Sequence, residues 1–360
     1  MPRQYINAVY YPNWRVYKDL PPSALQVKCI THIYYAFVGV TESGKIKLND
    51  EWADLGIDVD GVNGCIAAVA QIKRDNPGIK TIATFGGGEG SGPFPALAAS
   101  SRARSTFAAQ ARNFVDTHGF DGVDIDWEQP ANDAQGRDYL ALMHALRDAL
   151  PAPRYVLATA LPCGQWALRH IPLAHLAPLI DYLNLMSYDF SGPWTPAAGH
   201  QAQLRAPPPL PPSDPQQQQS PSGQAGVSYL IAHGVHPSKV ALGIPAYARC
   251  FAGARGPGDA YSAATEVDYR DLAADAVDGL ARVDEEAGAA CYVDENDGGG
   301  GNNMGFVSLD TPETVRLKAR YARANRLAGL FYWQGVGDVD TPGRSLVAAG
   351  WQELRAPYSD

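Results

Sequence analysis

The sequence predicts an α/β protein, a (β/α)8 or TIM barrel with a small α+β insertion between strands 7 and 8. Candidate strands recur eight times, and helical stretches separate most of them, which is the pattern of a parallel sheet. The chain has 360 residues, enough for one barrel of about 250 residues and an insertion. Because active sites of this fold lie at the C-terminal ends of the strands, we expect functional side chains there.

The predicted elements run from the N-terminus to the C-terminus in the order that a barrel needs. The strands are predicted at Tyr5–Tyr11, Ile30–Phe37, Lys80–Phe85, Gly122–Trp127, Tyr155–Ala160, Tyr182–Ser187, Val240–Ile244 and Gly329–Trp333. The helices between them are predicted at Cys65–Arg74, Arg102–Thr117, Gly136–Ala149, Val227–His233 and Pro312–Arg326.

Two regions depart from the barrel pattern. Pro207–Gly226 is rich in Pro, Gln and Ser, which predicts an exposed loop without a core of its own. The gap Ala252–Met304 contains a candidate strand, a candidate helix at Glu266–Ala273 and a glycine-rich tip at Asp297–Asn303. We therefore expect a barrel formed by residues 1–251 and 305–360, with an α+β insertion at 252–304.

Charge and hydropathy exclude two classes of partner. The net charge is −9 and no basic run is present, which disfavours nucleic acid and anionic membrane surfaces. No apolar run reaches the length of about 18 residues that a membrane span needs. The first residues, MPRQYINAVYY, lack the layout of a signal peptide, so we expect either that export does not use that route or that the leader is absent from this chain. We expect a monomer.

The five cysteines are scattered at Cys29, Cys65, Cys163, Cys250 and Cys291. None has the spacing of metal ligands, so no metal site is predicted from them. Free, buried thiols are the main expectation, a single disulfide remains open, and a disulfide scaffold is excluded.

The segment Phe120–Glu128 is the chemical centre of the sequence. Apolar residues alternate in it with Asp124, Asp126 and Glu128, which predicts a strand with three acids on one face, about 6–7 Å apart along it. Strands are depleted in Asp, and crowding like charges is unfavourable. The arrangement therefore indicates chemistry rather than stability.

Crowded carboxyls hold at least one proton to a higher pH, and the proton then belongs to the cluster. A carboxyl that stays protonated near neutrality is what a general acid needs, and Glu128 lies nearest the barrel mouth. Two alternatives remain at this point. The segment also fits a solvated acidic edge strand, or a site for magnesium or calcium, which prefer carboxylate oxygens.

The run FDGVDIDWE fits the signature Asp-x-x-Asp-x-Asp-x-Glu and resembles family-18 glycoside hydrolases, the chitinases, and their fungal members in particular. The resemblance implies a retaining chitinase that cleaves β-1,4 linkages between N-acetylglucosamine units through an oxazolinium intermediate. It makes Glu128 the general acid and base, with Asp126, Asp124 and Tyr188 as catalytic partners. Chitin or chito-oligosaccharide is then the substrate, and no metal or cofactor is required.

Other strand ends carry further motifs of this family. Thr84 and Gly87 lie in a Thr-Phe-Gly-Gly-Gly run where the family has Ser-x-Gly-Gly, and Gly88 replaces a frequent Trp, so a stacking surface is expected to be missing. Met186, Tyr188 and Asp189 match Met-x-Tyr-Asp. By the same resemblance, the substrate-binding residues are Tyr10, Trp14, Phe37, Thr84, Gly87, Met186, Asp189, Trp194, Tyr247, Arg249 and Trp333.

Ordinary structural roles also remain open for some of these residues. Tyr188 fits a core tyrosine with a satisfied hydroxyl, Arg249 a surface arginine, and Trp333 a residue that fills the barrel. Two other functions also fit the motifs: a chitin-binding lectin without catalysis, and an endo-β-N-acetylglucosaminidase acting on N-glycans. Relatives are usually exported, so an extracellular or cell-wall location is expected and a cytoplasmic one is the alternative. Endo action is expected rather than exo action.

Overall fold

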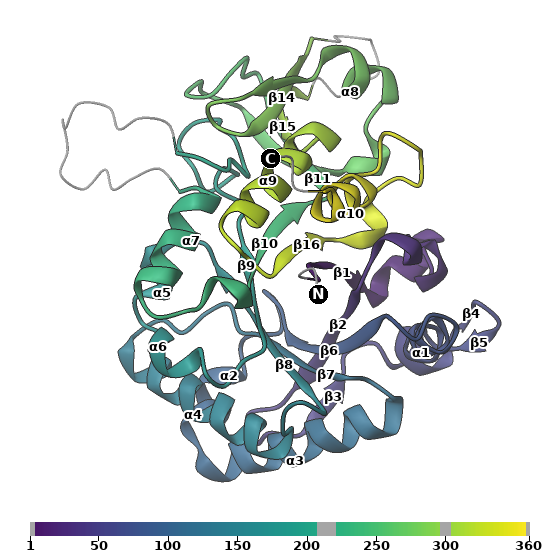
Figure 1. The fold of residues 1–360 in the computed structure, drawn as a ribbon, viewed down its shortest axis with the longest axis vertical. Helices are drawn as coiled ribbons and strands as arrows, with labels where there is room; N and C mark the ends of the chain where they lie inside the picture. Colours follow the sequence, from purple (N-terminus) through teal and green to yellow (C-terminus); the bar gives the residue numbers. More distant parts are fainter. Residues whose placement is uncertain (1–3, 207–220, 296–303, 358–360) are drawn as a thin grey trace.

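The computed structural model describes residues 4–206, 221–295 and 304–357. Eight parallel strands form a closed ring in the order β1-β16-β10-β9-β8-β7-β6-β2, and pairing of β1 with β2 closes it. The predicted (β/α)8 barrel is thus confirmed (Figure 1). Its strands are β1 Ile6–Pro12, β2 His32–Val40, β6 Lys80–Gly86, β7 Gly122–Asp126, β8 Val156–Pro162, β9 Tyr182–Met186, β10 Val240–Pro245 and β16 Gly329–Trp333.

The helices surround the ring, and each of the five helices predicted between the barrel strands has a counterpart (Figure 1). The helix α9 begins where the sequence signals it, because Thr311 caps its N-terminus in a capping box and Pro312 follows. The helices of the barrel are α1 Cys65–Asp75, α2 Phe94–Ala99, α3 Ser101–His118, α4 Asp133–Ala149, α5 Gln165–Leu168, α6 Leu173–Leu176, α7 Gly223–Ala232, α9 Pro312–Ala324 and α10 Leu346–Arg355.

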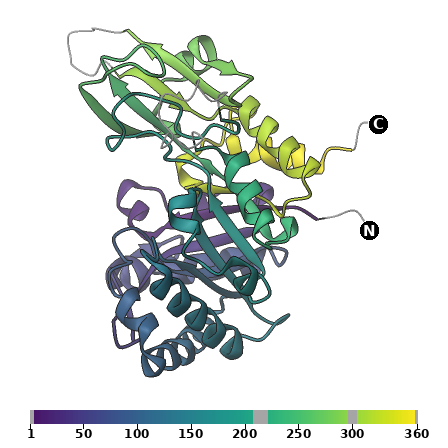
Figure 2. The same cartoon turned by 90° about the vertical axis from the view of Figure 1, so that its left-hand side faces the viewer.

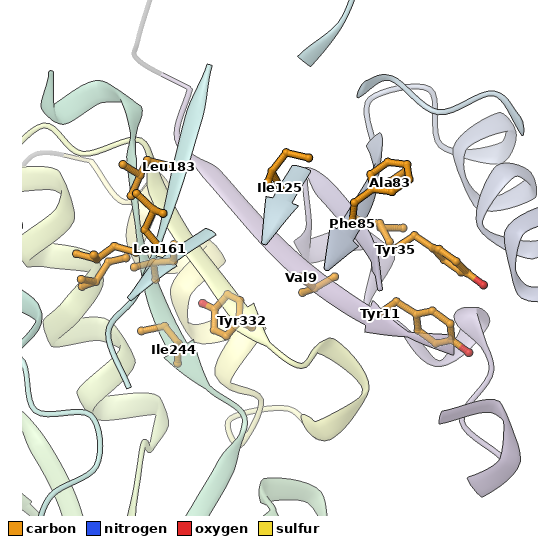
Figure 3. Packing of buried hydrophobic residues seen from close by; sticks show 14 of the residues in the cluster. Val9, Tyr11, Tyr35, Ala83, Phe85, Ile125, Leu161, Leu183, Ile244 and Tyr332 are labelled. Carbon is orange, nitrogen blue, oxygen red and sulfur yellow. The ribbon is translucent and has the colours of Figure 1, made fainter. Parts of the chain in front are cut away.

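The larger hydrophobic core lies between the strands and the surrounding helices. Figure 3 shows part of this layer, which includes Phe85 of β6, Ile125 of β7 and Leu183 of β9. A second cluster fills the barrel interior, with Tyr10, Tyr34 and Phe331 as its largest members. Because side chains alternate along a strand, the outward-facing Ile125 leaves Asp124 and Asp126 on the inward face of β7.

The insertion is a five-stranded sheet that lies at one end of the molecule (Figure 2). Its strand order is β12-β11-β15-β14-β13, and it carries the helix α8 Ala274–Leu280. The sheet runs from residue 247 to residue 309, so it extends beyond the predicted limits of 252 and 304 on both sides. Its strands are β11 Tyr247–Ala252, β12 Ala263–Asp268, β13 Arg282–Asp284, β14 Ala289–Asp294 and β15 Gly305–Leu309.

Two predictions for the irregular regions are wrong. The helix predicted at Glu266–Ala273 is instead the end of β12 and a short 3-10 turn, because pairing with β11 overrides the local preference. The predicted loop Pro207–Gly226 ends in helix, since α7 already begins at Gly223. The rest of that loop up to residue 220 and the glycine-rich tip Asp297–Asn303 lie outside the described residues.

Short strands complete the described structure. β3 (Ile46–Leu48) pairs antiparallel with β2, and β4 (Asp58–Val59) pairs with β5 (Val62–Asn63). Within the described ranges, no helix combines the length and the apolar character that crossing a membrane requires. The five cysteines are all free thiols.

Candidate active site

Two aspartates of β7 lie side by side beneath the mouth of the barrel. Asp124 and Asp126 are 0% and 4% exposed, so their carboxyls have been withdrawn almost completely from water. Glu128 follows the strand and is open to solvent, and its backbone N–H donates to the Oγ of Ser91 at 2.9 Å. The three acids therefore form a column that leads from the barrel interior to its surface.

The carboxyl of Asp124 is held by neighbouring strands. Its Oδ2 accepts hydrogen bonds from the hydroxyl of Tyr10 at 2.8 Å and from that of Thr84 at 3.1 Å. Burial raises the pKa of Asp124 to about 7, although both hydrogen bonds act in the opposite direction because they favour the ionised form. Thr84, named above as a substrate-binding residue, therefore contacts an inner aspartate in this structure.

Asp126 and Glu128 are also biased toward their protonated forms. Burial raises the pKa of Asp126 well above its usual value, and the charges of Glu128 and Asp124 raise it further. Partial burial raises the pKa of Glu128, and the negative charge of Asp189 raises it further. Protons are thus held in this cluster as expected, but burial is the larger cause, and crowding of charges adds to it only at Asp126 and Glu128.

A cavity of about 150 Å³ opens over the acids. Asp126, Glu128, Tyr188 and Trp333 all line it, so acidic and aromatic side chains face the same space. Trp333 stacks on Phe37, with ring centroids 5.6 Å apart and planes 23° from parallel. The remaining lining residues are Tyr10, Phe37, Gly88, Ala160, Met186 and Asp189.

Two larger cavities continue from this one. A cavity of about 600 Å³ shares Phe37 and Gly88 with it and is lined by Trp14. On the other side, a cavity of about 400 Å³ shares Glu128 and contains Trp194. The acids therefore lie part-way along one groove, which suits an extended polymer better than a small molecule that would be enclosed on all sides.

The glycines after β6 allow the chain to approach the acids closely. Gly86 and Gly87 both have positive φ, at 115° and 79°. A Cβ on Gly86 would lie 2.1 Å from the carbonyl oxygen of Asp126, and one on Gly87 would lie 2.5 Å from the ring of Phe37. Gly87 thus acts through its lack of a side chain. A Cβ on Gly88, by contrast, would make an ordinary van der Waals contact at 3.7 Å with the Oε1 of Glu128.

The insertion connects to the site through Asp189, which follows β9. Its Oδ1 accepts hydrogen bonds from the hydroxyl of Tyr247 at 2.8 Å and from the Nη2 of Arg249 at 2.5 Å. Arg249 also pairs with Glu266 at 3.3 Å and lies over the ring of Trp194 at 5.2 Å. The structure therefore places Tyr247 and Arg249 behind Asp189, rather than on the lining of the three cavities described above.

The structure also identifies residues that the sequence did not single out. Trp166 is 60% exposed and lines the same cavity as Trp194. Ser91 holds the loop after β6, because its hydroxyl donates to the carbonyl oxygen of Gly87 at 2.8 Å. Trp166 comes four residues after β8, so its place behind a strand end was a signal that could have found it. Ser91 gave no such signal.

No group of three or more His, Cys, Asp or Glu side chains in the described part of the chain has an arrangement that could hold a metal ion.

The sequence model of the family described as glycosyl hydrolases family 18 matches residues 6–338 of this chain. The chain belongs to glycosyl hydrolase family 18. The resemblance stated from the sequence is therefore confirmed, and the protein is a glycoside hydrolase.

Curated relatives of this family 18 glycosyl hydrolase cover almost all of its chain. Endochitinase 1 of Metarhizium robertsii is 32% identical over 375 aligned residues, which cover 98% of this chain and 86% of the relative. Chitinase 1 of Aphanocladium album is 30% identical, and the alignment covers 92% of this chain and 81% of the relative.

Solved structures share the fold of this family 18 glycosyl hydrolase. The Group IV chitinase of Ostrinia furnacalis in complex with allosamidin has a TM-score of 0.84 at 22% identity, and 98% of each chain is covered. A family 18 chitinase of Cycas revoluta in complex with (GlcNAc)3 has a TM-score of 0.79 at 24% identity, with 97% of this chain and 99% of that chain covered.

Proposed function

We propose that this family 18 glycosyl hydrolase is a chitinase, which hydrolyses β-1,4 linkages between N-acetylglucosamine units with retention of configuration. The observation that carries the proposal is the column of Asp124, Asp126 and Glu128, which lies part-way along a groove with aromatic walls. The relatives named endochitinase and chitinase support the same substrate. Because the groove continues on both sides of Glu128, endo action is part of the proposal.

Glu128 is the proposed general acid and base. Its raised pKa keeps a proton available to the glycosidic oxygen, whereas its contact with solvent gives water access for the second half of the reaction. The hydrogen bond from its backbone N–H to Ser91 fixes the start of the loop that carries it. The same side chain can therefore protonate the leaving group and later activate water.

The acetamido group of the substrate is the proposed nucleophile, and its carbonyl oxygen attacks the anomeric carbon of the same sugar. Family 18 enzymes are an exception to the usual pair of catalytic carboxylates. Asp189 is already engaged by Tyr247 and Arg249, which argues against a role for it as nucleophile. Attack by the acetamido oxygen as the leaving group departs gives an oxazolinium ion, which water then opens.

Asp126 and Tyr188 are proposed to handle the acetamido group. The Oδ1 of Asp126 is buried and has no hydrogen-bond partner among the described residues, so it is free to accept from the acetamido N–H. Tyr188 lines the same cavity, and burial followed by the charge of Asp126 raises its pKa, so its hydroxyl stays a donor for the carbonyl oxygen. Asp124 then exchanges a proton with Asp126 as positive charge develops.

The decisive test is hydrolysis of a defined chitin hexamer by the Glu128→Gln variant. We expect the rate to fall by about 10³-fold or more, because the variant loses both acid and base functions, while binding of the hexamer persists. Glu42→Gln, which changes an exposed acid far from β7 in the sequence, is the matched control and should retain the wild-type rate. Substantial turnover by Glu128→Gln would refute the assignment.

Substrate panels separate the remaining functions. The proposal predicts a bell-shaped pH profile and no cleavage of cellulose, which lacks the acetamido group. Binding of the hexamer without any release of sugar would instead identify a lectin. Preferential cleavage of a high-mannose glycoprotein would identify an endo-β-N-acetylglucosaminidase. A monomeric state and an extracellular location remain predictions, which light scattering and fractionation of a culture would test.

A further inference from the structure

Asn184 is a buried amide in the barrel interior to which the proposed reaction gives no role. Tyr182 and Met186 on the same strand pack against the interior cluster, whereas Leu183 and Leu185 belong to the outer core, so alternation directs Asn184 inward. The side chain is 0% exposed. Strands are depleted in Asn, and a buried amide is costly unless it is hydrogen-bonded. Its partner therefore indicates its role.

That partner is Tyr10, which lies on the opposite side of the barrel interior. The Nδ2 of Asn184 donates to the hydroxyl oxygen of Tyr10 at 2.9 Å, and the hydroxyl of Tyr10 donates to Asp124 at 2.8 Å. An amide nitrogen cannot accept a hydrogen bond, so Asn184 leaves the single proton of Tyr10 to Asp124. Tyr34 stacks on Tyr10 at 4.8 Å and fixes the plane of its ring.

The carboxyl of Asp124 is consequently asymmetric. Its Oδ2 accepts from both Tyr10 and Thr84, whereas its Oδ1 has no hydrogen-bond partner in the described ranges. A proton carried by Asp124 therefore belongs on Oδ1. The Oδ1 of Asp126 is also buried without a partner. The donor from Tyr10 thus decides which oxygen of Asp124 carries a proton and how strongly that proton is held.

We propose that Asn184 is a positioning residue of the reaction, which acts on Asp124 through Tyr10 and keeps the Tyr10 proton directed at that carboxyl. The proposal rests on the proposed function, in which Asp124 and Asp126 exchange a proton. Hydrogen bonds in series strengthen one another, so the donor from Asn184 also makes Tyr10 a stronger donor. Without it, Asp124 holds its own proton more tightly.

Several titratable groups face this network, but few of them ionise near neutral pH. Burial raises the pKa of each tyrosine around it above the ordinary value of 10.0, which leaves the carboxyls as the groups that titrate in the assay range. The groups are Tyr10 on β1, His32 and Tyr34 on β2, Asp124 and Asp126 on β7, Glu128 after β7, Tyr139 on α4, Tyr182 on β9 and Tyr188 after β9. Burial lowers the pKa of His32 to about 4, so its ring is neutral near neutral pH.

The test is the pH profile of kcat/KM for Asn184→Thr on the chitin hexamer. Threonine is close to asparagine in size and suits a strand, but its hydroxyl is one bond too short to replace Nδ2. At acidic pH the pair Asp124 and Asp126 takes up a second proton, and activity is lost. If the donor from Tyr10 is weakened, the pair takes up that proton at a higher pH. We therefore expect the acidic limb of the profile to move up by about 0.5 pH unit.

A double-mutant cycle shows whether Asn184 acts through Tyr10. Tyr10→Phe removes the donor to Asp124 and should move the acidic limb by about 1 pH unit. The double variant Tyr10→Phe, Asn184→Thr should match Tyr10→Phe alone, because the second change removes nothing further from Asp124. The matched control is Thr159→Val, which deletes a buried hydroxyl on β8 that donates to Ile125 and should leave the profile in place.

The outcomes separate this proposal from the proposed function. A wild-type protein that does not hydrolyse chitin would refute the function itself. A wild-type bell-shaped profile that Asn184→Thr reproduces, or additive shifts in the double variant, would overturn only the role of Asn184. Thermal unfolding establishes that each variant is folded. If Asn184→Thr does not fold, Asn184→Ala is used in its place. An acidic limb that stays unchanged in Tyr10→Phe would also overturn the proposal.

Discussion

Replacing Asp124 by asparagine should make the protein more stable at pH 8 while impairing its activity. Burial raises the pKa of Asp124 from 3.8 to about 7 in the folded protein. For an acid, a raised folded-state value means that stability is fully present below pH 3.8 and is lost as the pH rises to about 7. Asparagine carries no charge, so the variant avoids that loss.

The size of the effect follows from the same shift. At 1.36 kcal/mol per pKa unit, the rise from 3.8 to about 7 corresponds to about 4 kcal/mol of stability lost above pH 7. The Oδ1 of asparagine can still accept from Tyr10 and Thr84, so those hydrogen bonds persist. For a chain of 360 residues, we expect the Tm at pH 8 to rise by about 5 °C.

The assay is calorimetric unfolding of Asp124→Asn and the wild type at pH 4 and pH 8. The difference in Tm should be small at pH 4, because folded Asp124 is protonated there and unfolded Asp124, with its pKa near 3.8, is only partly ionised. Asp121→Asn is a control of opposite sign, because Asp121 pairs with Lys73 at 2.8 Å and its loss should destabilise the protein at pH 8. A variant that is no more stable than the wild type at pH 8, or equally stabilised at pH 4, would refute the reasoning.

Two further predictions concern a buried pair and an exposed aromatic. Lys318→Met should reduce the free energy of unfolding by about 3–5 kcal/mol in urea, because it leaves Asp310, its partner at 2.6 Å, buried and unpaired. Arg320→Met, which removes an exposed pair, should cost about 1 kcal/mol or less. Trp166→Ala should raise KM for the chitin hexamer about threefold to tenfold and leave kcat unchanged. Trp52 is equally exposed and lines none of the three cavities, so Trp52→Ala should change neither KM nor kcat. An equal rise in KM for both variants would show that Trp166 does not bind the substrate.

The barrel was predictable because its strands carry local signals. In β7, the alternation of acidic and apolar residues identifies both the strand and its inward face. The same signal fails in β12, whose sequence, AATEVD, has no alternation of apolar and polar residues and suits an exposed edge strand or a loop equally well. Pairing with β11 decides its structure, and no local window contains that information.

The site was predictable to the extent that its residues follow strand ends in recognisable motifs. Tyr188 and Trp333 follow that rule and reach the same cavity. Arg249 also follows it, yet the contact that defines it, with Asp189, depends on the insertion folding back over the barrel. Asn184 lies in a strand that was predicted, but one polar residue in a strand does not reveal that its partner is Tyr10, 174 positions away.

The last strand of the ring in chain order, β16, lies between β1 and β10. Trp333, at the end of β16, therefore reaches the pocket only after nearly the whole polypeptide has been made, whereas the acids of β7 are synthesised about 200 residues earlier. A nascent chain on the ribosome consequently has the proposed proton donor long before it has the aromatic surface proposed to receive a sugar. An inhibitor bound against Trp333 should slow exchange of amide hydrogens along the seam between β1 and β16.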